Sequence, residues 1–92
     1  MKRMQAEFFA AEVLGWLAED HARIGAFLGM TGMAPADLRR AAGDSELLLA
    51  VVDFLMADEA LLLDCCRSLD VPATTPAAAR AALPGSEQVH WT

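Results

Sequence analysis

The sequence has no tyrosine and only two cysteines in 92 residues, and aromatic residues make up 7% of the chain. No stretch alternates apolar and polar residues in the way that predicts a β-strand. The two cysteines, Cys65 and Cys66, are neighbours, and adjacent residues rarely meet the geometry of a disulfide. These absences exclude a disulfide framework and a sheet, and they favour a helical protein in a reducing compartment, the cytoplasm.

Positive charge is also scarce. Seven Lys and Arg residues stand against 13 Asp and Glu residues, which leaves a net charge of −6. Because an acidic chain has no bulk attraction for phosphate groups, neither nucleic acid nor an anionic membrane is the expected partner. The longest apolar segment, residues 47–63, contains Asp53, Asp58 and Glu59, which are costly inside a bilayer, so no membrane span is predicted.

Apolar helix formers are what the chain has in abundance, and 55% of its residues are hydrophobic. So small a domain cannot bury all of them, and we expect some to reach the surface and serve a partner. Capping residues, prolines and glycines divide the chain into predicted helices. Their ranges are 3–18, 21–30, 36–42, 45 to a break near 57–58, 59–69 and, after a cap at Thr75, 76–83.

Short connections between these helices favour antiparallel neighbours, so the predicted fold is all-α, a compact bundle of five to six short helices. It forms a single domain over residues 1–85, and residues 86–92 are expected to be a flexible tail.

The segment from Leu47 to Leu69 is apolar almost all round, which predicts a position at the centre of the bundle. A single helix from Ser45 to Ser68 is one interpretation. Asp58 followed by Glu59 is typical of a helix start, however, and favours a break there. Asp53 is a carboxylate in the most apolar part and must find solvent, a helix-end N–H or an arginine.

No residues form a recognisable catalytic, cofactor or metal motif. Cys65 and Cys66 lie in an apolar helix, where thiols usually serve packing, and their adjacency does not match the spacing of zinc ligands. We therefore predict no enzyme, no cofactor and no metal. A thiol-based sensor that uses one of these cysteines is an alternative.

Residues 31–40 have the outline of the turn in a helix-turn-helix. In that interpretation the helix from Pro35 to Ala42 would place Arg39 and Arg40 on DNA, which makes DNA binding a second alternative. The net charge and the neighbouring Asp37 favour a structural corner instead. A protein-binding three-helix unit of the ubiquitin-associated type, with residues 31–33 as its loop, is a further alternative.

Several segments together resemble a small alphaproteobacterial-type helical family that is catalogued only as a domain of unknown function. They are FLGMTGMAPADLR at residues 27–39, VDFLMADEALLL at residues 52–63, the acidic pair at 19–20 and AALPG at 81–85. The resemblance covers residues 6–85 and implies a small, cytoplasmic, helical protein with no established activity. It also implies genes beside those of cell-cycle response regulators, and thus a regulator that acts on a receiver domain of a phosphorelay.

The prediction is therefore a non-enzymatic protein–protein interaction or regulatory module. Its partner is expected to be another protein, such as a response-regulator receiver, or a second copy of the chain in a homodimer. The expected partner surface combines aromatic residues at the rim of the core with the acids of the central segment. It consists of Phe8, Trp16, Asp53, Asp58 and Glu59.

Overall fold

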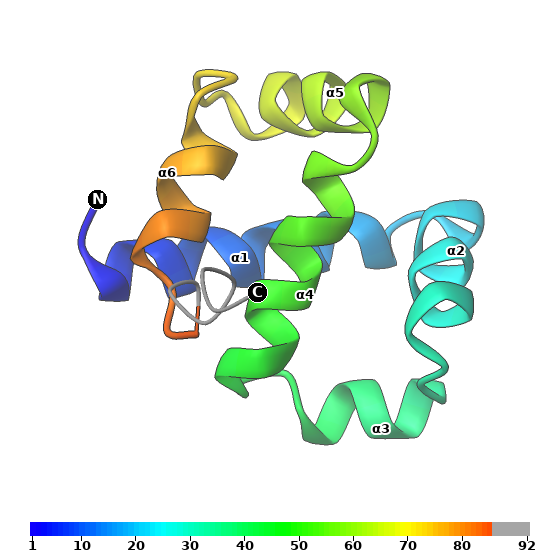
Figure 1. Cartoon of the computed structure of the whole chain (residues 1–92). Coiled ribbons are helices and arrows are strands. Elements are labelled where there is room, and N and C mark those ends of the chain that lie inside the picture. Colours follow the sequence, from blue (N-terminus) through cyan, green and yellow to red (C-terminus); the bar gives the residue numbers. More distant parts are fainter. Residues whose placement is uncertain (86–92) are drawn as a thin grey trace.

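Six α-helices make up the fold in the computed structural model, which describes residues 1–85 (Figure 1). They are α1 (Arg3–Ala18), α2 (His21–Thr31), α3 (Pro35–Arg40), α4 (Ser45–Met56), α5 (Glu59–Leu69) and α6 (Thr75–Ala82). No strand occurs in this part of the chain, and the predicted all-α fold is confirmed. The tail predicted at residues 86–92 lies outside the described residues.

Three helices begin at an aspartate that accepts hydrogen bonds from the free N–H groups of the first turn. Asp20 accepts from Ala22 and Arg23 at 2.8 and 3.2 Å. Asp44 caps α4 and Asp58 caps α5 in the same way. The backbone hydrogen bonds that Asp20 accepts, first that from Arg23 and then that from Ala22, hold the pKa of its carboxyl below the usual value. The helix starts are thus encoded locally, which is why they could be predicted.

The central apolar segment is broken where Asp58 predicted a break. Ala57 ends α4, Asp58 adopts an extended backbone with φ −131° and ψ 103°, and α5 leaves at a sharp corner (Figure 1). The alternative of one helix from Ser45 to Ser68 is therefore wrong.

Several helix bounds differ from the prediction by one or two residues, and one helix has an unexpected C-cap conformation. The third helix ends at Arg40, two residues early, because Ala41 already leaves the helical region. Thr75, expected as a cap, is instead the first helical residue of α6, and Thr74 before it makes no capping hydrogen bond. Asp70 ends α5 in a left-handed conformation with φ 57°, which is rare outside glycine and which no sequence signal indicated.

The core forms where α4 crosses α1 and α6. Five apolar residues of α4 are buried, and they meet the apolar face of α1 and the inner side of α6. These α4 residues are Leu47, Leu48, Val51, Val52 and Leu55. α5 buries only its two cysteines, and Leu63 on it is 40% exposed. The central position predicted for residues 47–69 thus holds for α4, whereas α5 lies at the edge.

Candidate interaction surface

The five residues predicted as a partner surface have different neighbours in the structure. Phe8 is exposed near the start of α1, and Trp16 is buried two turns later on the same helix. Asp53 pairs with a residue of α6, and Asp58 and Glu59 form the start of α5. Of these five residues, only Phe8 offers an exposed aromatic ring.

Trp16 is 8% exposed, so it does not present its ring to a partner as expected. The guanidinium of Arg23 lies over its ring, 3.8 Å from the centroid. Arg23 also comes within 3.8 Å of the carboxylate of Asp20, the N-cap of its own helix, so the stacking on Trp16 is the contact that ties α2 to α1. Trp16 therefore contributes to the α1–α2 corner, where the stacked cation stabilises it.

Asp53 finds an arginine, one of the three environments considered for it. The Nε of Arg80 on α6 donates a hydrogen bond to the Asp53 carboxylate, across 27 residues of sequence. The two side chains are 27% and 43% exposed, for Arg80 and Asp53 respectively. The pair thus links α4 to α6 at the margin of the core, and Asp53 serves packing.

Asp58 and Glu59 are both explained by the start of α5. The Asp58 carboxylate accepts the N–H of Leu61 at 3.1 Å. Glu59 lies in the first turn, where its negative charge is favourable to the helix dipole. Glu59 is exposed and no described hydrogen bond or ion pair involves its side chain, so of these two acids it is the freer to meet a partner.

Cys65 and Cys66 are both buried and free. Burial, with a smaller contribution from neighbouring Cys66, raises the pKa of the Cys65 thiol to about 12. Burial likewise raises the pKa of Cys66. A thiol that stays protonated at neutral pH is a poor nucleophile, so this environment favours a packing role.

The helix-turn-helix outline corresponds to the end of α2, a turn at Gly32 and α3. Gly32 has a φ of 76°, the left-handed conformation expected there. α3 is six residues long and buries none of them, and Arg40 pairs with Asp37 one turn before it. One of the two arginines predicted for DNA is thus engaged by an acid of its own helix.

The surface feature that the sequence reasoning missed is the outer face of α1. Five residues at a three-to-four spacing are all exposed, on the side of the helix opposite its buried residues. We call this set the outer stripe: Met4, Phe8, Ala11, Gly15 and Ala18. Met4 is 80% and Phe8 68% exposed. Beside them lies an apolar hollow of about 390 Å³, lined by Lys2, Met4, Gln5 and Phe8.

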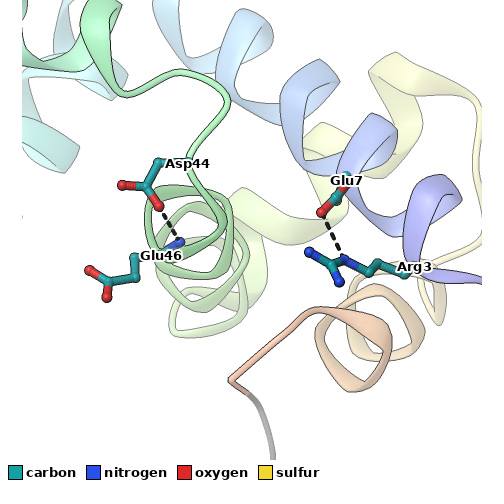
Figure 2. A network of polar contacts seen from close by, with 4 residues as sticks. All are labelled: Arg3, Glu7, Asp44 and Glu46. Carbon is teal, nitrogen blue, oxygen red and sulfur yellow. Dashed lines mark hydrogen bonds and ion pairs between the residues drawn. The ribbon is translucent and has the colours of Figure 1, made fainter.

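Two local polar contacts lie near the starts of α1 and α4. Figure 2 shows Arg3 and Glu7, whose Nε and Oε2 atoms are 3.2 Å apart on successive turns of α1. It also shows the Asp44 carboxylate accepting the N–H of Glu46 at the start of α4. Each contact is local to its own helix, and Met4 and Phe8 stay exposed beside the first of them. The spacing of residues 4, 8, 11, 15 and 18 was the signal that could have found the stripe.

Neither a metal site nor a membrane-spanning helix is found in residues 1–85. There, no three His, Cys, Asp or Glu side chains come together in a way that could hold a metal ion. None of the six helices is both long and apolar enough to cross a membrane. The exposed apolar face of α1 is the surface feature that calls for an explanation.

A comparison with protein families gives a match over nearly the whole chain. A family model described as "Protein of unknown function (DUF3572)" matches residues 3–86. Searches of curated proteins and of solved structures found no match. The matched range spans all six helices, including the outer stripe.

Proposed function

The chain belongs to the DUF3572 family, whose function is unknown, and we propose that it is a non-enzymatic protein-interaction module that binds through the outer stripe of α1. The single observation that carries this proposal is the exposure of Met4 and Phe8 on the face of α1 opposite the core. Glu59, exposed at the start of α5, is a secondary contact carried over from the sequence prediction.

An exposed phenylalanine beside an exposed methionine is unfavourable in water. Burying such a side chain contributes roughly 1.5–3 kcal/mol, so a partner that covers Phe8 gains that free energy. Aromatic side chains near the centre of an interface often dominate its affinity, and methionine adapts to different partner shapes. Within the described residues, the core does not use Phe8, which leaves it available for binding.

The family resemblance adds an alternative partner class to this proposal, the receiver domain of a response regulator, beside a second copy of the chain. A regulator of that kind acts in the cytoplasm, and the two free, buried cysteines are compatible with this location. Direct titration of a purified receiver domain against the chain tests this partner. If none of the receiver domains of the source organism binds saturably, a receiver is not the partner.

Substitution of Phe8 by glutamate tests the proposed surface. The matched control is Met30→Glu, because Met30 is 59% exposed on α2 and lies outside the outer stripe. We expect Phe8→Glu to abolish capture of partner proteins, while Met30→Glu retains them and both variants keep the helical circular dichroism of the parent. If Phe8→Glu retains every partner, the stripe is not the binding surface.

DNA binding stays a second hypothesis because Arg39 is exposed on α3. It requires retention on DNA that weakens with salt and with replacement of Arg39 and Arg40. A mobility-shift assay at low salt in which the parent protein fails to bind would dispose of it.

A further inference from the structure

We propose that the occupant of the outer stripe is α1 of a second copy of the chain, packed antiparallel about a two-fold axis that passes near Ala11. The inference rests on the proposed function and names the partner of the same surface. Three features of α1 support it: the order of side-chain sizes along the stripe, the charges at the two ends of the helix, and the open space over its small residues.

Side-chain size changes from large to small along the stripe. Met4 and Phe8 occupy its N-terminal half, and Ala11, Gly15 and Ala18 occupy the rest. Ala11 is seven residues from both Met4 and Ala18, so an antiparallel partner places Met4 opposite Ala18. Phe8 is three residues from Ala11 and Gly15 is four, so Phe8 comes within about one residue of Gly15 on the partner helix. Large side chains then fill the space over small ones at both ends, as knobs into holes require.

The space over the small half is open. A Cβ atom added to Gly15 would meet nothing within 4 Å. A helix partner can therefore approach closely there, and the Phe8 ring of the second copy has room to lie on the Gly15 backbone. A parallel pair would instead set the Phe8 rings against each other and leave the small halves with a gap between them.

The charges at the ends of α1 also suit an antiparallel partner. Lys2 and Arg3 stand at its start, with no acid in the first turn, and Glu19 and Asp20 follow its end, with no base in the last turn. This order is unfavourable to the helix's own dipole. Beside an antiparallel copy, however, the basic start of each helix lies next to the acidic end of the other, and the two dipoles oppose each other.

Oligomeric state is the first test. Sedimentation equilibrium of the full chain is expected to show a monomer–dimer equilibrium. Phe8→Glu should weaken dimerisation by about 30-fold or more, as loss of a central anchor does, because each dimer buries two such positions. Met30→Glu should leave the dissociation constant of the dimer unchanged. A parent chain that is monomeric at all concentrations up to about 1 mM overturns the proposal.

Disulfide cross-linking of introduced cysteines then tests the orientation. The native Cys65 and Cys66 are buried, so the parent chain itself should not cross-link. In the antiparallel pair, the two Met4 positions lie about 20 Å apart. Met4→Cys alone should therefore give no disulfide-linked dimer, while Met4→Cys mixed with Ala18→Cys should give one. Ala11→Cys alone should also cross-link. Efficient cross-linking of Met4→Cys alone would show a parallel pair and overturn the proposal.

These results separate the two proposals. If the parent is monomeric but Phe8→Glu still loses another protein partner, the second copy is the wrong occupant and the proposed function stands. If Phe8→Glu changes neither dimerisation nor partner capture, both proposals fail together.

Discussion

Asp53 shows how a single residue can be recognised as constrained before its partner is known. A carboxylate between Val52 and Phe54 had to be satisfied somehow, and the structure supplies Arg80. Nothing local to either residue predicts the pairing, since it depends on where α6 packs against α4. Sequence reasoning could therefore state the requirement and not the solution.

A double-mutant cycle measures what this pair contributes. Asp53→Ala and Arg80→Ala should each lower the free energy of unfolding, and the coupling between them should be about 0.5–1 kcal/mol, because both side chains are partly exposed. Urea unfolding of the parent, both single variants and the double variant gives the coupling. Additive effects of the two substitutions would mean that the Asp53–Arg80 contact contributes no coupling free energy.

Cys65 should make the protein sensitive to alkali. Its thiol has a pKa of about 12 when folded, against an ordinary value of 9.0, so folding favours the protonated form. This contribution to stability is full below about pH 9 and is lost as the pH rises toward 12. The chain has no tyrosine, so no phenol titrates over the same range.

The measurement is urea unfolding at intervals from pH 8 to pH 11. Between pH 9 and pH 11 the parent should lose about 2–3 kcal/mol more than Cys65→Ala, at about 1.4 kcal/mol per pH unit. The variant should be less stable than the parent at pH 8, because it loses the packing of the sulfur, and its profile should be flatter. Parallel profiles for the two proteins would contradict a buried Cys65 thiol.

At the scale of the element, capping explains why the helix bounds were predictable. Asp20, Asp44 and Asp58 each satisfy N–H groups within three residues, so the signal and its effect lie in the same short segment. The end of α3 and the C-cap conformation of α5 were less predictable. Asp70 takes a left-handed conformation, and α3 stops at Arg40 although helix formers follow it.

Asp58 also separates α4 from α5, and its removal should be felt in α5. Asp58→Ala should lower the free energy of unfolding by about 1 kcal/mol, because the N–H of Leu61 loses its acceptor. For a domain of this size that corresponds to a fall in Tm of about 4–8 °C. Asp58→Asn is the control, since asparagine caps almost as well. An equally large loss in Asp58→Asn would assign the effect to charge.

At the scale of the whole molecule, the fold class followed from composition and local signals, and the candidate site did not. α1 carries apolar residues on two opposite faces. The buried face includes Phe9, Val13 and Leu17, whereas from the opposite face the predicted partner surface included only Phe8. Which of two apolar faces becomes the core depends on the placement of α4 and α6, which is a tertiary property.

If two copies associate through the outer stripe, the stability of the chain must depend on its concentration. Dimerisation stabilises only the folded state, so above the dissociation constant a tenfold rise in concentration adds about 0.7 kcal/mol per chain. The Tm of the parent should then rise by about 3–5 °C per tenfold, measured by differential scanning calorimetry. Phe8→Glu should have a Tm that is independent of concentration, because its dimer does not form. The Tm of Met30→Glu should rise with concentration as that of the parent does. A parent Tm that stays constant over a hundredfold range of concentration would mean that the outer stripe does not pair with itself.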